Sequence, residues 1–389
     1  MSEAAERYLR LALRLARHDE GVVDAYFGPA DVAESVENEE VRSPADLVTD
    51  AEALLGELDD SWLRDQVVGL RTVAGRIAGE RLAYRDEVEA CHGVRPERTG
   101  ESALTDTFER LEQLLPGSGS LAERRREWER SIEVPATRVG ALMKAVVEEA
   151  RACTRDLVGL PEGEQIEVEL VTDVPWLGYH DYLGDLRGLI IVNTDLPRSA
   201  VELLHLALHE SYPGHHAERC LKDVTLVRDR GLLEETVVLV PTPQSLVSEG
   251  TAELAPEMLL DGQAGPAFEA IVRDLGIDLD LPHARAVERA LEPLDGLQVD
   301  AALMLHEEGR PEAEVHAFLV RWGLVEADLA GHAIRFVQDP TSRTYAVCYP
   351  AGRERCRAYV AGDPDHRRAR FRRLLTEQVR VRELLEPSL

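Results

Sequence analysis

The chain is almost devoid of lysine. Its 44 basic residues include only Lys144 and Lys222 as lysines, the rest being arginines, and they stand against 73 acidic residues. The formal net charge of −29 argues against nucleic acid or an anionic membrane as a partner, because phosphates require basic side chains to neutralise them. An acidic surface with little lysine is typical of halophilic proteins, in which carboxylates hold water while salt screens their repulsion. A high-GC genome is the alternative reason for the arginine bias.

Cysteine and long apolar runs are also scarce. The five cysteines are scattered, odd in number and without a Cys-x-x-Cys pair, so we expect free thiols in a reducing compartment. No run of eighteen or more apolar residues occurs, which predicts no membrane-spanning helix. Residues Met1–Arg17 lack an apolar stretch followed by a small-residue cleavage site, so they predict an amphipathic helix, not a signal peptide. We therefore expect a cytoplasmic location.

Helical periodicity covers most of the 389 residues. It predicts a mainly α fold, because apolar residues recur at helical spacing in long stretches separated by Pro and Gly breakers. No Pro/Ser/Gly-rich linker divides the chain, so we expect one domain over 1–389, with a helical N-terminal part (1–160) and a metal-site part (161–389). The predicted helical stretches are 5–16, 45–58, 62–84, 121–160, 197–210, 246–260 and most of 283–389.

One segment has the pattern of β-strands instead. Gln165–Thr172 alternates apolar and charged residues, and Leu189–Asn193 is a short β-branched run. Between them, residues 175–188 are rich in Trp, Tyr, Gly and Asp, as in a loop or hairpin. We expect a small sheet or hairpin beside the next helix, and we expect the strand Leu189–Asn193 to align an extended substrate by backbone pairing.

The string from His209 to His216 carries the strongest chemical signal, reading His-Glu-Ser-Tyr-Pro-Gly-His-His. In His-Glu-x-x-His enzymes the two histidines lie one turn apart on a helix and face one zinc ion. The glutamate beside the first histidine, here Glu210, then acts as general base on the zinc-bound water. The pattern predicts one zinc ion as cofactor, with His209 as a ligand.

The spacing of the second histidine departs from that motif. His216 returns to the face of His209 in an unbroken helix, but about 10 Å further along the axis, too far to share one zinc ion. Pro213 and Gly214 can bulge the helix and draw a later histidine back, because proline cannot donate the helical hydrogen bond and glycine adopts almost any backbone conformation. His215 and His216 therefore both remain candidates for the second ligand.

A third ligand is expected from a later helix. Glu249 and Glu253 lie at i and i+4 about forty residues downstream, so one can bind the metal while the other orients a ligand histidine. On spacing alone, two solvent-facing acids in an acidic protein would be the simpler interpretation.

These paired motifs closely resemble those of domain-of-unknown-function family 885, which is distantly similar to helical zinc metallopeptidases of the carboxypeptidase Taq group. The likeness rests on His-Glu-x-x-Pro-Gly-His-His followed by Ser-Glu-Gly-x-Ala-Glu at residues 248–253, and one departure is Thr251, where the family often has an aromatic residue. Weaker likenesses extend over Phe27–Pro29, Leu114–Gly117, Pro175-Trp176 through Pro197, Asp300–His306 and the Tyr-x-x-Gly-Arg segment ending at Arg353.

The resemblance implies a large helical metallopeptidase-like domain. It implies His209, His215 and Glu249 as metal ligands and Glu210 as the general base, with His216 as an alternative ligand or substrate-facing group. By similarity to related peptidases, Tyr349 is our candidate to stabilise the oxyanion, with His306 next and Arg353 as a carboxylate anchor.

The expected function is zinc-dependent hydrolysis of short peptides. A peptide or a small amide is the expected substrate, and the sequence says nothing of the oligomeric state. The motif does not separate a peptidase from a hydrolase of non-peptide amides or esters. A non-catalytic helical protein with a degenerate metal site is the third hypothesis, and the altered histidine spacing is its best argument.

Overall fold

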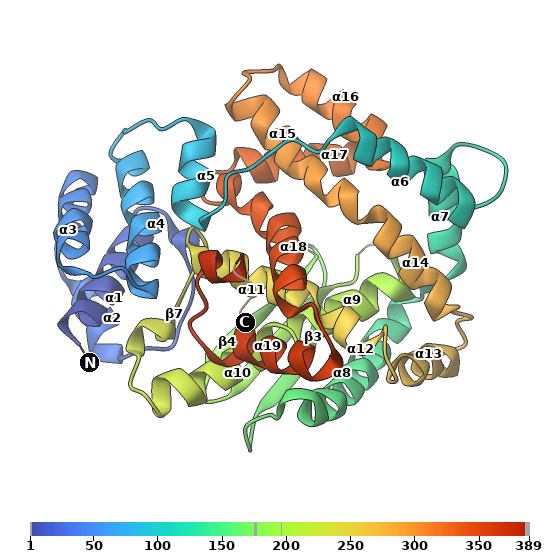
Figure 1. The fold of residues 1–389 in the computed structure, drawn as a ribbon, viewed down its shortest axis with the longest axis horizontal. Helices are drawn as coiled ribbons and strands as arrows, with labels where there is room; N and C mark the ends of the chain where they lie inside the picture. Colours follow the sequence, from blue (N-terminus) through green and yellow to red (C-terminus); the bar gives the residue numbers. More distant parts are fainter. Residues whose placement is uncertain (1, 175–176, 196, 386–389) are drawn as a thin grey trace.

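The N-terminal helices form a small bundle at one end of the molecule, shown in blue in Figure 1. The computed structural model describes residues 2–174, 177–195 and 197–385. Serine side chains cap three of the bundle's four helices at Ser2, Ser43 and Ser61 by accepting hydrogen bonds from backbone N–H groups of the first turn. The elements are α1 (Glu3–Ala16), β1 (Val23–Tyr26), α2 (Ala30–Asn38), α3 (Pro44–Glu57) and α4 (Trp62–Ile77).

The next helices lead to the centre of the molecule. The stretch predicted to hold one or two long helices at 121–160 holds two, which a short strand separates. The elements are α5 (Tyr84–His92), α6 (Glu101–Leu114), α7 (Leu121–Ser131), β2 (Glu133–Val134) and α8 (Ala136–Val158).

A three-stranded sheet follows, as the alternation of residues predicts. Its strands are β3 (Gln165–Val171), β4 (Gly178–Gly184) and β5 (Arg187–Asn193), in the order β3-β5-β4. β5 runs parallel to β3 and antiparallel to β4. The predicted loop or hairpin at 175–188 therefore contains a strand, although Pro175, Trp176 and Leu196 lie outside the described residues.

The role predicted for the strand at 189–193 is wrong in one respect. β5 lies in the middle of the sheet and is hydrogen-bonded to a neighbour on each side along its length. Its backbone N–H and C=O groups are therefore already paired with the neighbouring strands, and a substrate cannot add to it. β4 is the strand at the sheet edge that contacts α9 and α10.

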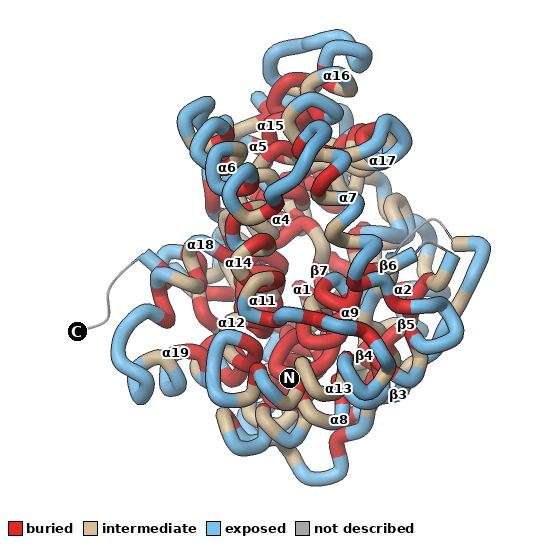
Figure 2. The backbone as a smooth tube through the Cα atoms, turned by 90° about the vertical axis from the view of Figure 1, so that its right-hand side faces the viewer, coloured by how far each residue is buried: buried red, intermediate tan, exposed pale blue. Residues whose placement is uncertain are grey.

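The helices that bear the predicted metal ligands lie at the centre (Figure 2). The helix predicted at 197–210 forms over Ala200–Glu210, and the one predicted at 246–260 divides at Leu254. Nearly every residue of α11 is buried, which explains why its sequence lacks an exposed polar face. The elements are β6 (Arg198–Ser199), α9 (Ala200–Glu210), α10 (His215–Lys222), β7 (Val237–Leu239), α11 (Pro243–Glu253) and α12 (Ala255–Leu259).

The C-terminal third is helical, as predicted. Its helices are α13 (Gly265–Asp274), α14 (Leu281–Leu291), α15 (Gly296–His306), α16 (Glu312–Gly323), α17 (Ala327–Gln338), α18 (Cys348–Val360) and α19 (Pro364–Thr376). Short 3-10 or π-helical segments are Glu20–Val22, Asp223–Arg228, Leu233–Thr236, Glu292–Asp295, Ser342–Val347 and Val381–Leu384. Among the described residues, no helix is long and apolar enough to cross a membrane.

The fold is mainly α with small sheets, and elements from both sides of residue 160 pack together. β1 pairs with β7, β2 pairs with β6, and α8 packs on α9. α9 contributes to a core with α8 and the sheet, whereas α11 contributes to a second core with α18 and α19. The candidate site therefore lies where these two hydrophobic cores meet.

Candidate metal centre

The junction between α9 and α10 decides where the histidines point. α9 starts with a capping box in which Ser199 and Glu202 satisfy each other's backbone N–H groups, and it ends at Glu210. The Pro-Gly pair does not bulge one continuous helix, because α9 stops and α10 begins afresh at His215. A Cβ atom at Gly214 would overlap the carbonyl oxygens of Leu208 and His209, so only glycine lets the chain fold back this closely.

This fold-back brings three potential ligand side chains together. The Nε2 atoms of His209 and His215 lie 3.1 Å apart. Oxygen atoms of the Glu249 carboxylate lie 3.3 Å from His209 Nε2 and 3.4 Å from His215 Nε2. Ligand atoms of a tetrahedral zinc ion, each about 2.0–2.1 Å from the metal, are about 3.3 Å apart. The three side chains therefore fit one zinc-sized ion.

The hydrogen-bonding state of Glu249 supports the same fit. Its Oε2 atom is buried and has no hydrogen-bond partner among the described residues. A buried carboxylate oxygen without a donor is costly, and an ion is one of the few groups that can satisfy it. Two imidazole nitrogens and a carboxylate oxygen are one of the donor sets of catalytic zinc sites, which leave a fourth position open.

The charges of the three side chains are strongly coupled. Burial opposes ionisation of Glu249, but His215 and His209 hold the pKa of its carboxyl well below the ordinary range. Burial likewise opposes protonation of His215, yet the Glu249 carboxylate raises the pKa of its ring to about 9. Without a metal ion, protons on the histidine rings balance the charge of the Glu249 carboxylate. A bound metal ion would displace these protons from the ligand nitrogens.

Glu210 lies beside these ligands without being one of the three. It is the last residue of α9 and is only 8% exposed. Burial raises the pKa of its carboxyl, while the nearby rings of His209 and His215 act in the opposite direction. A carboxylate with a raised pKa next to a metal position is suited to accept a proton and to return it.

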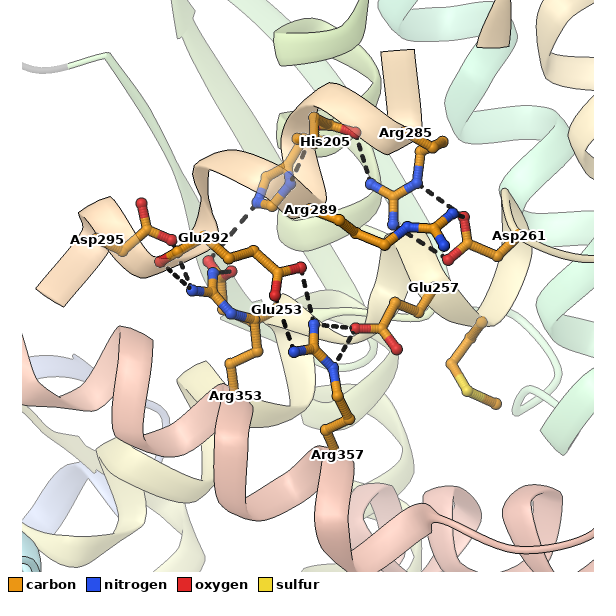
Figure 3. Close-up of polar contacts among 12 residues, drawn as sticks. His205, Glu253, Glu257, Asp261, Arg285, Arg289, Glu292, Asp295, Arg353 and Arg357 are labelled. Carbon is orange, nitrogen blue, oxygen red and sulfur yellow. Dashed lines mark hydrogen bonds and ion pairs between the residues drawn. The ribbon is translucent and has the colours of Figure 1, made fainter. Parts of the chain in front are cut away.

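Glu253 does not join the three ligands but supports one of them. Its Oε1 atom lies 3.5 Å from His209 Nδ1, the ring nitrogen that faces away from Glu249. Arg353 donates to Glu253 at 2.9 Å, and its guanidinium lies 2.6 Å from Asp295 (Figure 3). The Arg353 charge is therefore balanced by two carboxylates, so this arginine holds Glu253 in place and offers no free charge to a substrate.

His205, His209 and Glu253 also bring three potential ligand atoms within 4.8 Å of one another. The Arg353 guanidinium already donates a hydrogen bond to Glu253, and its positive charge would repel a metal ion bound there. The group of His209, His215 and Glu249 is the better metal site because, in the described part of the chain, none of its hydrogen bonds or ion pairs involves an arginine or a lysine.

Two tyrosines from the region before and at the start of α18 approach the centre. Tyr345 donates a hydrogen bond of 2.6 Å to Glu249 Oε1. The ring of Tyr349 packs against that of Tyr345 with centroids 5.6 Å apart. Burial and the negative charges of Glu249 and Glu210 raise the pKa of Tyr349 well above its ordinary value, so its hydroxyl remains a hydrogen-bond donor at neutral pH.

Close packing of helices places these tyrosines. A Cβ atom at Gly250 of α11 would collide with the backbone of Gly352 in α18, so the pair of glycines allows the two helices to touch. The close contact between Gly250 and Gly352 places the start of α18 near Glu249.

The structure does not bring two predicted residues to the centre. His216 is fully buried on the far side of α10, where its Nδ1 atom lies 3.1 Å from His180 Nε2 and burial lowers its pKa to about 3. His306, at the end of α15, has its Nε2 atom 2.6 Å from the Val337 carbonyl oxygen and its ring against Tyr84. Both rings are engaged elsewhere, so His215 is the second histidine of the centre.

Several residues that lie near the centre are not identified as site residues by the sequence motifs. Ser248 contacts His215, Glu218 contacts Ser248, and Tyr345 contacts Glu249. The position of Ser248 beside Glu249 was the one available signal for it. The charges of His215 and Glu249 affect the pKa of Asp24 in β1, but nothing in the sequence links a residue so far upstream to the motif.

A cavity of about 500 Å³ adjoins the centre. Its lining includes Glu253, Tyr349 and Arg353 from the surroundings of the centre, but not His209, His215 or Glu249 themselves. Much of the remaining lining comes from the C-terminal region and is apolar, with Leu291, Leu294, Leu297, Leu319, Val325 and Ala330. Such a cavity suits a small organic group better than a folded protein.

No known family model matches the sequence, and no curated protein matches it. Among solved structures, the chain is similar to the crystal structure described as "the putative lipoprotein from Colwellia psychrerythraea". The TM-score is 0.52 at 13% sequence identity, and the match covers 89% of this chain and 69% of the other. A likeness at this identity shows the fold alone.

Proposed function

We propose that this protein is a zinc-dependent hydrolase that cleaves short peptides. The observation that carries the proposal is the group of His209, His215 and Glu249. Its two Nε2 atoms lie 3.1 Å apart, and each lies 3.3–3.4 Å from one oxygen of the Glu249 carboxylate, while the Glu210 carboxyl interacts electrostatically with all three side chains. A structural zinc site has no use for an additional buried carboxylate, whereas a hydrolytic site requires one as a base.

The residues divide the chemistry among themselves. A zinc ion bound here would supply Lewis acidity towards the scissile carbonyl and the attacking water. Glu210 takes the proton of the attacking water at its carboxylate and delivers it to the leaving nitrogen. The Tyr349 hydroxyl donates a hydrogen bond to the carbonyl oxygen as negative charge develops there. Glu253 and Tyr345 hold His209 and Glu249 in their orientations.

Peptides are the proposed substrates for two reasons. The motifs resemble those of domain-of-unknown-function family 885, which is distantly similar to helical zinc peptidases. In addition, β4 offers a sheet edge that an extended peptide can join by backbone hydrogen bonds. The adjoining cavity of about 500 Å³ would accept an apolar side chain of such a peptide. We also propose a reducing, cytoplasmic location, which the five free cysteines support.

The test compares the wild type with Glu210→Gln and a matched variant, Glu148→Gln, which removes an exposed carboxylate on α8. Zinc content and hydrolysis of a library of short peptides are measured for each protein. We expect Glu210→Gln to keep its zinc and to lose about 10²–10⁴-fold in kcat, while Glu148→Gln matches the wild type.

Two results would contradict the proposal. One is a wild-type protein that binds no zinc-like metal, and the other is a Glu210→Gln variant that hydrolyses the peptides at the wild-type rate. Acyl-amide and ester compounds are assayed in parallel, and cleavage of these without peptides would replace the peptide substrate but retain the metal chemistry.

A further inference from the structure

The ring nitrogen of His215 that faces away from the ligand position contacts a buried hydroxyl. Ser248 Oγ lies 3.3 Å from His215 Nδ1 and 2.5 Å from Glu218 Oε2. Lys222 Nζ donates to the other oxygen of Glu218 at 2.7 Å. An unbroken chain of polar contacts thus runs from the ligand histidine through a serine and a carboxylate to an ammonium group.

Counting donors and acceptors fixes the direction of each bond. A carboxylate only accepts hydrogen bonds, so the single proton of Ser248 goes to Glu218. The Ser248 oxygen must then accept from its other neighbours, which are His215 Nδ1 and, at 3.4 Å, the Arg219 guanidinium. His215 therefore carries a proton on Nδ1, and its Nε2 atom is the nitrogen left to present a lone pair to a metal.

Glu218 must be ionised for this count to hold. Burial alone would raise the pKa of its carboxyl, but the charges of Lys222 and Arg219 lower it to about 2. Glu218 and Ser248 are 1% and 2% exposed, so water does not compete for these bonds. The hydrogen bond from Ser248 to a buried, charged acceptor is correspondingly strong.

The identity of the cation supports a specific role. The chain uses arginine almost everywhere, yet one of its two lysines, Lys222, is buried here against Glu218, whereas Lys144 is exposed. A compact ammonium group one helical turn from Glu218 neutralises it as a point charge and leaves Glu218 Oε2 to Ser248.

We infer that Ser248, held by the Glu218–Lys222 pair, is a positioning residue that fixes the tautomer and orientation of His215 for zinc binding. This inference rests on the proposed zinc site. Outer partners of metal-binding histidines raise metal affinity because they restrain the ring and increase its basicity. On the other histidine, the Glu253 carboxylate, which accepts from Arg353, lies 3.5 Å from His209 Nδ1 without forming a hydrogen bond to it.

The test uses the full-length wild type, Ser248→Ala and the control Ser245→Ala. Ser245 is a buried serine on the same helix whose hydroxyl donates to the Leu239 carbonyl oxygen, so its loss removes a comparable bond without touching a ligand. The zinc dissociation constant is measured by competition with a chelator, and the Co²⁺-substituted proteins are compared by visible absorption. Thermal unfolding of the metal-free proteins shows whether each variant folds.

We expect Ser248→Ala to weaken zinc binding about 10–100-fold and to change the Co²⁺ spectrum, while Ser245→Ala leaves both at the wild-type level. A Ser248→Ala protein that folds and binds zinc as the wild type does would overturn the inference, as would an equal loss in Ser245→Ala. These results are distinct from failure of the proposed function, in which the wild type itself binds no zinc.

Discussion

Tyr345 and Tyr349 are four residues apart, and their hydroxyl groups serve different partners. Tyr345 is committed to Glu249 Oε1, so its effect on catalysis passes through a metal ligand. Tyr349 lines the cavity beside the centre, and the charges of Glu249 and Glu210 raise the pKa of its hydroxyl. We therefore propose that Tyr349 contacts the substrate carbonyl and that Tyr345 acts by positioning the candidate ligand Glu249.

Replacing Tyr349 by Phe removes one hydroxyl and preserves the ring packing. We expect kcat for peptide hydrolysis to fall about 10²–10³-fold with KM and zinc affinity nearly unchanged, because the lost hydrogen bond forms mainly in the transition state. Steady-state kinetics with a cleaved peptide and a zinc competition titration measure the two effects.

Tyr345→Phe is the matched control, and it should behave differently. It leaves Glu249 with one donor fewer, so we expect weaker zinc binding and recovery of kcat at saturating zinc. If Tyr349→Phe retained the wild-type kcat, Tyr349 would have no role in stabilising the oxyanion.

At the scale of single residues, part of the candidate site could be predicted from the sequence. The residue types and spacing indicated His209, Glu210 and the carboxylates of α11, because these follow from which faces of two helices meet. Choosing between His215 and His216 required the backbone path through Pro213 and Gly214, which spacing does not determine. Contacts such as that of Tyr345 with Glu249 join residues about a hundred positions apart, and no local pattern encodes them.

Among the elements, the turn between α9 and α10 is the least tolerant of change. Gly214 N donates to the Leu208 carbonyl oxygen at 3.2 Å, and α10 restarts directly from this contact. The resulting bend puts His215 beside His209 and turns His216 into the core. One glycine thus determines which of the two adjacent histidines faces the metal position.

Gly214→Ala is expected to separate the ligand histidines. The added methyl group would overlap the carbonyl oxygens of Leu208 and His209, so the start of α10 must move away from α9. We expect a loss of about 1–3 kcal/mol in the free energy of unfolding and zinc binding below detection. Urea unfolding and zinc titration test these outcomes.

Gly56→Ala is the opposite case of the same substitution. Gly56 lies in the exposed part of α3 with open space around its Cα atom, so alanine should stabilise the protein by about 0.5–1 kcal/mol. Wild-type zinc affinity in Gly214→Ala would show that the fold-back does not depend on glycine.

The elements themselves were largely predictable, and their pairing was not. Periodicity indicated many of the helices and two of the strands because it reports which face of a local segment is buried, but the predicted stretches did not include α2, α5, α6, α10 or α13. It did not reveal β4, whose Gly, His, Asp and Tyr residues lack the usual alternation, nor the order β3-β5-β4. Strand order depends on contacts between segments, and for this reason the substrate-aligning role was predicted for the central strand instead of the edge.

For the whole molecule, the dominant feature is its charge. With 73 acidic and 44 basic residues, 29 negative charges remain uncompensated even when every arginine and lysine is charged. Two of the cations, Arg353 and Lys222, are moreover buried and donate to Glu253 and Glu218 around the candidate metal centre. The surface therefore carries a large excess of like charges, which repel one another in the folded state more than in the expanded chain.

This excess predicts that salt stabilises the protein. The Debye length falls from about 10 Å at 0.1 M salt to about 3 Å at 1 M, so KCl should weaken the repulsion steeply at first and then level off. We expect the melting temperature to rise by a few degrees over this range, corresponding to about 1–2 kcal/mol of added stability. Sucrose, which acts by exclusion from the protein surface without screening, is the control and should give a gradual rise without a plateau. Exposed ion pairs weaken under the same screening, and if they dominated, the melting temperature would fall with KCl. A flat or falling curve would remove the case for adaptation to high salt and leave genome composition as the reason for the arginine bias.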